Sequence, residues 1–112
     1  MSIVYLACPY SHPDPEVRHA RFLAANRAAA RLMAEGLVVF SPLSHGHAIA
    51  QTDVGLPTDY EFWRKSCHAF MRACSSVTVL MLPGWEESVG IADELKIAEA
   101  LDLPVAHLAE DY

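Results

Sequence analysis

The sequence predicts an α/β fold: a single doubly wound domain, flavodoxin- or Rossmann-like, with a mainly parallel sheet of four or five strands. Two observations predict this class. Short apolar segments alternate with longer segments of helical periodicity, the pattern of parallel strands joined by crossover helices. The chain has 112 residues, of which 53% are hydrophobic, so residues 1–112 suffice for one domain with its own core.

The first strand is expected over residues 2–7, which form a short, continuous apolar run. A helix then begins with Asp14 as its N-cap and Pro15 at its first position, and it runs to about Glu35. Gly36 is expected to end this helix, because glycine adopts the left-handed conformation found after many helices.

The second strand is expected over residues 37–40, followed by a loop over residues 41–47. Thr58 and Glu61 have the spacing of a capping box and predict the start of a second helix near Asp59. One apolar face of that helix is expected to contain Trp63, Cys67, Phe70 and Cys74.

A third strand is expected over residues 77–82, and after a loop over 83–88 a helix runs to about Leu101. Residues 103–108 are expected to form a short fourth strand. In doubly wound sheets ligands bind beyond the carboxyl ends of the strands. The loops expected there are residues 8–12, 41–47 and 83–88.

Glu94 breaks the polarity pattern of the last helix. At 100° per residue it falls among Ile91, Leu95 and Ala98 on the apolar side, away from the other charged residues. A buried carboxylate costs several kcal/mol unless it is paired or protonated. Glu94 is therefore either a structural carboxylate that caps a loop or pairs with an arginine, or a functional one that faces the ligand crevice.

Ser88 and Gly90 precede this carboxylate at the start of the same helix. Ser88 is the natural N-cap, and capping alone would explain it. Gly90 removes a side chain where the helix opens, which would let a ligand approach the free N–H groups.

The segment from Ser88 to Glu94, SVGIADE, resembles the S-x-G-x-x-x-E segment of nucleoside 2-deoxyribosyltransferases and deoxynucleotide N-glycosidases. Residues 5–10, YLACPY, are similar to the first strand and loop of that superfamily, and residues 83–88 resemble a branch of small uncharacterised members. The resemblance implies that Glu94 is a nucleophile at the anomeric carbon and that Ser88 and Gly90 lie near the phosphate or 5′ group.

The chain departs from the superfamily on the helix before the third strand. The aspartate that the resemblance predicts there is replaced by Cys67, whose place on the apolar face also suits a core residue. Because that aspartate helps protonate the leaving base or orient the sugar, the chain needs a substitute acid. Asp59, Glu61 and His68 are the candidates.

Three further residues of the expected crevice loops are candidate ligand contacts. Tyr10 has a hydroxyl suited to a sugar or a base, and His45 suits a ligand contact or a backbone bond. Trp85 would either stack on a base or pack beneath its loop as a lid. His45, His47, Cys67 and His68 match no standard zinc spacing, so we expect no metal and no cofactor.

The composition limits the classes of partner and the location that we expect for this protein. The net charge is −6, which disfavours a nucleic acid polymer because polyanions bind to basic patches. No apolar run is long enough for a membrane span and no basic segment precedes the first strand, so we expect neither a membrane protein nor a signal peptide. Three cysteines suggest reduced thiols and a cytoplasmic location.

Three functions fit these features. The first is cleavage of an N-glycosidic bond, or 2-deoxyribosyl transfer, on a nucleoside or its monophosphate. The second is a nucleotide-binding module that kept the crevice but lost the acid. The third is a structural partner with an unused crevice. Members of the superfamily commonly build the site across a subunit interface, so we also expect a homo-oligomer, with Phe62, Trp63 and Tyr112 as contacts.

Overall fold

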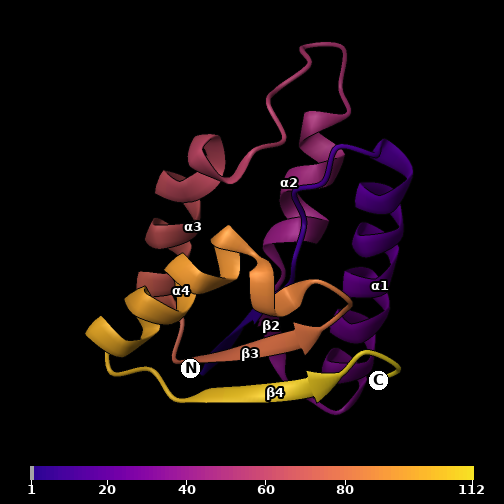
Figure 1. Cartoon of the computed structure of the whole chain (residues 1–112). Helices are drawn as coiled ribbons and strands as arrows, with labels where there is room; N and C mark the ends of the chain where they lie inside the picture. Colours follow the sequence, from indigo (N-terminus) through magenta and orange to yellow (C-terminus); the bar gives the residue numbers. More distant parts are fainter. Residues whose placement is uncertain (1) are drawn as a thin grey trace.

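The structure, a computed structural model, describes residues 2–112 as a parallel sheet between two layers of helices (Figure 1). None of the helices in this described part is both long and apolar enough to cross a bilayer. The elements in chain order are β1 (Ile3–Ala7), α1 (Pro15–Ala34), β2 (Val38–Phe40), α2 (Pro42–Ala50), α3 (Tyr60–Ala73), β3 (Ser76–Met81), a 3₁₀ turn (Trp85–Glu87), α4 (Val89–Ala100) and β4 (Val105–Ala109).

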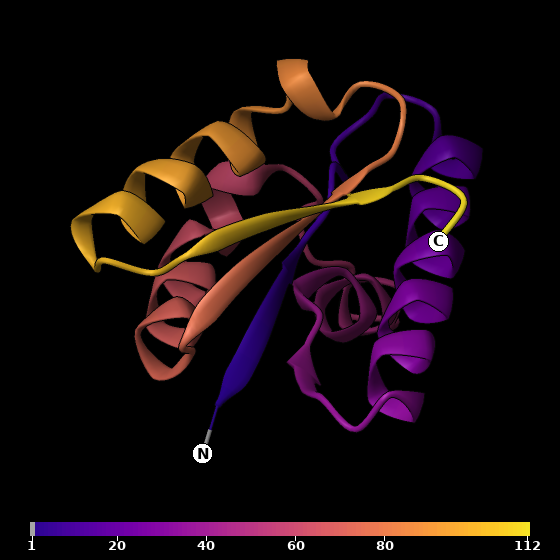
Figure 2. The same cartoon turned by 90° about the horizontal axis from the view of Figure 1, so that it is seen from below.

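The sheet has four strands in the order β2-β1-β3-β4, and all neighbours are parallel (Figure 2). This confirms the predicted fold class, including the interior position of the strand that follows α3. Val4 pairs with Val39 of β2 on one side and with Ser76 of β3 on the other. The chain reverses its direction of strand addition between β1 and β3, and such a switch point leaves a crevice beyond the strand ends.

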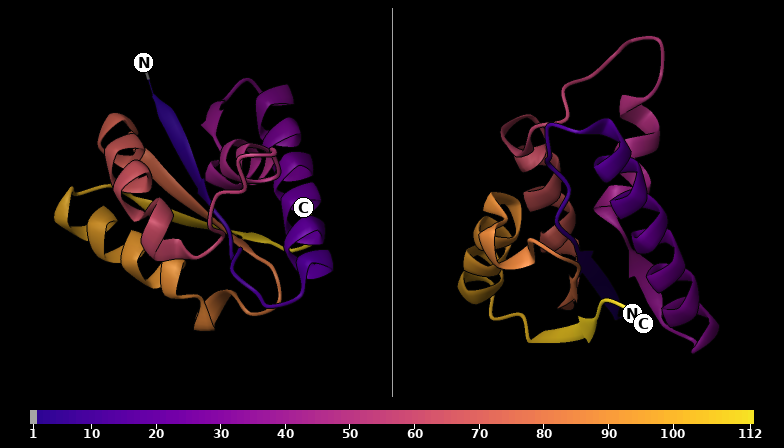
Figure 3. Two further views of the ribbon diagram at one scale, coloured as in Figure 1. Left: turned by 90° about the horizontal axis from the view of Figure 1, so that it is seen from above. Right: turned by 45° about the vertical axis from the view of Figure 1, so that its right-hand side comes forward.

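Helices cover both faces of the sheet. Helices α1 and α2 lie together on one side, and α3 and α4 lie on the other (Figure 3). The predicted start of α1 is confirmed, because the Asp14 carboxylate accepts a hydrogen bond from the Glu16 N–H at 2.9 Å and Pro15 is the first helical residue. Gly36 follows the helix with φ +95°, as expected of a stop residue.

The expected loop over residues 41–47 is wrong, because helix α2 occupies this segment. Ser41 is its N-cap and accepts a hydrogen bond from the Ser44 N–H at 3.2 Å, while Pro42 is its first residue. The N-cap–proline signal is the same one that starts α1, so the sequence did carry the information. The placement of two histidines changes with it, since His45 and His47 now lie on a rigid helix.

The predicted start of α3 near Asp59 is confirmed, but the expected capping box is wrong. The helix begins at Tyr60 with Asp59 as its N-cap, and Asp59 makes no side-chain capping bond. Thr58 and Glu61 therefore do not form the expected capping box, which requires Thr58 at the N-cap position.

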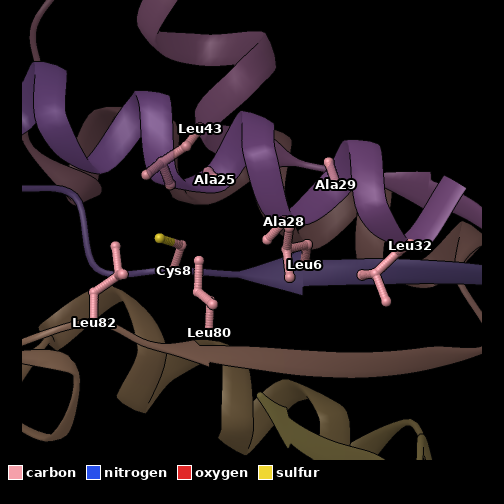
Figure 4. Packing of buried hydrophobic residues seen from close by; sticks show 9 residues of the cluster. All are labelled: Leu6, Cys8, Ala25, Ala28, Ala29, Leu32, Leu43, Leu80 and Leu82. Carbon is pink, nitrogen blue, oxygen red and sulfur yellow. The ribbon is translucent and has the colours of Figure 1, made fainter. Parts of the chain in front are cut away.

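Each face of the sheet has its own core. Side chains alternate along β1, so Leu6 and Cys8 point toward α1 and α2 whereas Tyr5 and Ala7 point toward α3 and α4. The first core is closely packed and largely aliphatic (Figure 4). Its buried members are Leu6, Cys8, Ala25, Ala28, Ala29, Leu32, Leu43, Leu80 and Leu82. The buried members of the second are Tyr5, Ala7, Cys67, Met71, Val77, Val79, Ile91 and Ala98.

Candidate functional site

A cavity of about 350 Å³ lies beyond the carboxyl ends of β1, β2 and β3. This volume falls within the usual range of small-molecule sites. Residues that follow each of the three strands contribute to its lining, together with residues of α2, α3 and the start of α4. The cavity thus occupies the switch point at which a doubly wound sheet is expected to bind a ligand.

Glu94 lies in the wall of this cavity, on the second turn of α4, with 4% of its surface exposed. Its carboxyl group accepts a hydrogen bond from the hydroxyl of Tyr5, which is itself fully buried on β1. The helix pattern predicted that Glu94 would be turned inward. The bond to Tyr5 now anchors the carboxyl group to the central strand and fixes its position.

Burial raises the pKa of Glu94 to about 8, and the neighbouring Asp93 charge adds to the effect. The hydrogen bond from Tyr5 acts the other way, because it stabilises the carboxylate. In the free protein the group is therefore mostly protonated at neutral pH and ionises slightly above it. Such a pKa, close to the working pH, suits a group that exchanges a proton or attacks a substrate.

Ser88 and Gly90 both line the cavity at the start of α4. Ser88 caps the helix, with its hydroxyl accepting a hydrogen bond from the Ile91 N–H at 3.2 Å. A Cβ atom on Gly90 would lie only 2.9 Å from Cδ1 of Tyr60. The absence of a side chain at Gly90 is thus explained by the packing of the Tyr60 ring, without the ligand approach that the sequence suggested.

The candidate acid His68 is directed away from the cavity. Its Nε2 lies 2.5 Å from Oδ2 of Asp93, and the Tyr60 hydroxyl donates to the same carboxylate at 2.9 Å. These bonds, together with Arg64 Nε at 3.7 Å, lower the pKa of Asp93 even though partial burial opposes the change. His68 misses the cavity because it follows Cys67 on α3, and consecutive helical residues point about 100° apart.

Asp59, another candidate acid, is exposed at the start of α3, and neither it nor Glu61 contributes to the cavity wall. Cys67 does line the cavity and is buried. Burial raises the pKa of its thiol to about 11, so the group is neutral at physiological pH. The carboxylate that lines the cavity besides Glu94 belongs to Glu87, a residue that sequence reasoning did not single out.

Tyr10 and His45 both line the cavity, as expected. His45 packs with the rings of Phe40 and Phe70, at centroid distances of 5.7 and 5.4 Å. Those two rings are themselves stacked at 4.2 Å, so one side of the cavity is aromatic. Such a surface suits a planar, weakly polar group such as a nucleobase.

Trp85 does not line the cavity, so its predicted ligand contact is wrong in this structure. The indole packs against the His107 ring of β4 at 5.6 Å and adjoins the core beneath α4. Gly84 adopts φ +90° just before the 3₁₀ turn, and the turn directs Trp85 toward the sheet edge and Glu87 toward the cavity. Of the two alternatives, Trp85 therefore takes the packing role.

Sequence reasoning missed Arg21, and it considered His47 only as a possible metal ligand. Arg21 lines the cavity. Its guanidinium donates to the backbone carbonyls of Tyr10, Ser11 and Pro83 at 3.2–3.3 Å, which ties the loop after β1 to the loop after β3. His47 is buried on α2 beside Tyr10. The Ser41–Pro42 helix start could have located His47, because it places His45 and His47 on a helix.

In residues 2–112 no three His, Cys, Asp or Glu side chains are grouped closely enough to hold a metal ion. All three cysteines are free thiols. The sequence of residues 2–110 matches a family described as a domain of unknown function, DUF1937. No curated protein matches the chain significantly.

Proposed function

Because the chain belongs to the DUF1937 family, whose description assigns no activity, we propose its function from the cavity itself: cleavage or transfer of the N-glycosidic bond of a nucleoside or nucleoside monophosphate. Glu94 would act as the nucleophile. The observation that carries this proposal is a buried carboxyl group, bonded by Tyr5, in the wall of a cavity of small-molecule size. The resemblance of the Ser88–Glu94 segment to nucleoside 2-deoxyribosyltransferases supports the same chemistry.

The cavity lining suits the three parts of such a substrate. The Phe40 and Phe70 rings offer a stacking surface for a base. The free N–H groups at the start of α4, beside Ser88, favour an anionic or polar 5′ group. Glu94, one turn further along the helix, would then reach the sugar between them and attack its anomeric carbon, as in retaining glycoside hydrolysis.

Ionisation of Glu94 gives the proposal a pH dependence. A nucleophilic carboxylate must be deprotonated, and the pKa of Glu94 is raised to about 8. Base release should therefore increase as the pH rises from 6 toward 9, before substrate binding is taken into account. The substrate's own groups will shift this value, so kcat/KM, which reports the free enzyme, is the quantity to measure.

The test is incubation with a panel of nucleosides and their 5′-monophosphates, followed by detection of free base. Glu94→Gln keeps the shape of the protonated side chain but removes the attacking charge. It should bind the best substrate within a few-fold of wild type and release base at least about a hundredfold more slowly. Glu99→Gln, on the exposed side of the same helix, is the matched control and should be unaffected. A Glu94→Gln variant with the wild-type rate would make Glu94 structural.

A second function is favoured by one observation. The side chain at the position of the expected aspartate is Cys67, a neutral thiol that faces the cavity. If the chain has no other acid, it would bind a nucleotide without cleaving it. Nucleotide binding by calorimetry, with no base released from any member of the panel, would support this binding module over the enzyme.

We further propose a cytoplasmic homo-oligomer. Phe62 is 46% exposed and packs edge-on against Trp63, whose ring lies in the cavity wall. A second copy that covers Phe62 would complete this side of the cavity. Light scattering of wild type and Phe62→Glu tests this, with an unchanged mass for the variant counting against Phe62 as a contact.

A further inference from the structure

A chain of three side chains leads from the surface to the cavity. Tyr10 lies in the cavity wall, and its hydroxyl is 2.6 Å from Nδ1 of His47. Nε2 of His47 lies 3.3 Å from Nδ1 of His19, which is exposed on α1. The three residues come from the loop after β1, from α2 and from α1, so only the folded chain brings them together.

His47 is the central member and is 95% buried, since only 5% of its surface is exposed. Both of its ring nitrogens have a partner, and each partner can donate or accept a hydrogen bond. The proton order of the whole chain can therefore reverse by a change of tautomer, which is the requirement for passing a proton through an imidazole. The Phe22 ring packs against His47 at 4.5 Å and shields it further.

The surroundings keep His47 neutral. Burial lowers its pKa, and the nearby His19 and Arg18 lower it further because they disfavour a second positive charge. Arg18 lies on α1, where its guanidinium donates to the backbone carbonyl of His12. A neutral imidazole with a donor on one nitrogen and an acceptor on the other transmits a proton and does not store it.

The second polar chain that reaches the cavity lacks this property. The Tyr60 hydroxyl donates a hydrogen bond to the Asp93 carboxylate, and Nε2 of His68 is hydrogen-bonded to the same oxygen. A carboxylate accepts but does not donate, so this arrangement holds the Tyr60 proton in place. Tyr60 is therefore a positioning residue that packs on Gly90, and the Tyr10 chain is the one able to deliver a proton.

We propose that Tyr10 is the general acid that protonates the leaving base, and that His47 and His19 form the relay that resupplies its proton. This proposal rests on the proposed function and supplies the acid that Cys67 does not provide. As Glu94 bonds to the anomeric carbon, the C–N bond breaks and its electron pair stays on the base nitrogen. That nitrogen takes the Tyr10 proton, Tyr10 takes the Nδ1 proton of His47, and Nε2 of His47 takes the Nδ1 proton of the exposed His19. Water then restores His19.

The relay explains how a tyrosine can act as an acid here. Burial raises the pKa of Tyr10, so a lasting phenolate would be unfavourable. With His47 hydrogen-bonded behind it, Tyr10 regains a proton as it loses one. No phenolate needs to accumulate, because the proton that Tyr10 loses is replaced through His47 from the exposed His19.

The decisive experiment compares two leaving groups on the same 2-deoxyribosyl sugar. An ordinary nucleobase needs protonation to leave, whereas p-nitrophenolate leaves as a stable anion and needs none. Tyr10→Phe and His47→Asn should each lower kcat for base release by about a hundredfold, the scale of a general acid. His19→Gln, at the exposed end, should lower it by about tenfold, since water partly replaces His19. Nitrophenolate release should stay within about twofold of wild type in all three variants.

The controls separate proton delivery from folding. His107→Gln replaces an exposed histidine that contacts Trp85 and lies outside the chain, and it should change neither rate. Imidazole added to the His19→Gln variant should restore base release, because a small buffer can supply the proton at the surface. If His47→Asn is too unstable to assay, the exposed His19→Gln variant still decides the question.

Each outcome has one meaning. Equal loss of both activities would make the three residues structural and overturn the relay, as would no loss of base release in the Tyr10 and His19 variants. If the wild-type protein releases nitrophenolate but no base, it has a nucleophile but no general acid. That result overturns the relay and leaves the role of Glu94 unchanged. A wild-type protein that releases neither product overturns the proposed function and the relay with it.

Discussion

On the face of the sheet covered by α1 and α2, the hydrophobic core is mostly leucine and alanine, and the buried imidazole of His47 lies between these two helices. The face covered by α3 and α4 instead encloses the carboxyl group of Glu94 and the hydroxyl group of Tyr5. The two faces share the same strands and differ in the residues that alternate along them. Leu6 and its neighbours contribute stability by removing apolar surface from water. Glu94 costs stability whenever it ionises, because its charge is then buried.

Such a contrast is expected where a site carries a chemical task. Groups placed for function are commonly destabilising, and the rest of the fold compensates for them. The face with α1 and α2 would then supply the stability that lets the other face keep a carboxyl group with a pKa near 8. This division of roles can be measured, because removing the buried carboxyl group should stabilise the protein at high pH, whereas truncating a core leucine on the other face should destabilise it.

The largest expected effect comes from Glu94→Gln. The pKa of Glu94 is about 8 in the folded chain against an ordinary value of 4.5, so folding favours the protonated form. The stabilisation is present below pH 4.5 and is lost as the pH rises through about 8. Glutamine does not titrate. Relative to wild type, the variant should therefore gain about 4 kcal/mol of unfolding free energy between pH 5 and pH 9, measured by urea denaturation.

Other titrating groups are common to both proteins and cancel in this difference. Glu99→Gln, exposed on the same helix, should differ from wild type by the same amount at pH 5 and pH 9. A Glu94→Gln difference that is equally constant would mean that Glu94 is solvated or paired, and the contrast between the two faces would disappear.

On the opposite face, Leu6→Ala should lower stability at every pH. Leu6 is fully buried between β1 and α1, and its truncation leaves a cavity in a closely packed core (Figure 4). We expect a loss of about 3 kcal/mol, or about 10 °C in Tm. Leu23→Ala removes the same atoms from a residue on α1 that is 50% exposed, and it should cost less than about 1 kcal/mol. Equal losses for the two variants would show that the core is loosely packed.

Two glycine-to-alanine substitutions should change the free energy of unfolding in opposite directions. A Cβ on Gly90 would lie 2.9 Å from the Tyr60 ring, so Gly90→Ala forces the ring to move. Gly46 lies within α2, and its Cβ would meet Trp63 at an ordinary 3.5 Å. Gly46→Ala should gain about 0.5–1 kcal/mol from helix propensity. Gly90→Ala gains the same propensity but should still lose about 1 kcal/mol net, because of the clash. Stabilisation by both substitutions in thermal melts would contradict the contact between Tyr60 and Gly90.

The smallest effect concerns the bond between Tyr5 and Glu94. Tyr5→Phe removes the hydroxyl that stabilises the carboxylate, so the pKa of Glu94 should rise further. NMR titration of the Glu94 carboxyl carbon measures this directly, and stability at pH 6 should fall by about 1 kcal/mol. Tyr112→Phe removes a hydroxyl that donates to Glu35, the C-cap residue of α1, and it should leave the Glu94 titration unchanged. No change in the Tyr5→Phe titration would mean that this bond does not orient the carboxyl group.

The order of strands and helices, the parallel sheet and the inward position of Glu94 all follow from patterns along the chain. A short apolar run, an N-cap followed by proline, or a carboxylate on the apolar side of a helix depends on residues close together in sequence. These signals are local, and they located α1, the four strands and the burial of Glu94 correctly. The same kind of signal at Ser41 and Pro42 also marks α2, although we interpreted that segment as a loop.

Which side chains meet at the cavity depends on packing between segments that lie far apart in sequence. The pairs His68 with Asp93, Gly90 with Tyr60, and His47 with Tyr10 are each separated by at least 25 residues. Helical periodicity predicts that His68 points about 100° away from Cys67. It does not predict which of the two side chains faces the cavity. The docking of α3 on α4 settles that choice, and the approach of α2 to α1 buries His47 between them. A local sequence pattern cannot predict either contact, because the packing energy that favours the contact arises only when the helices come together.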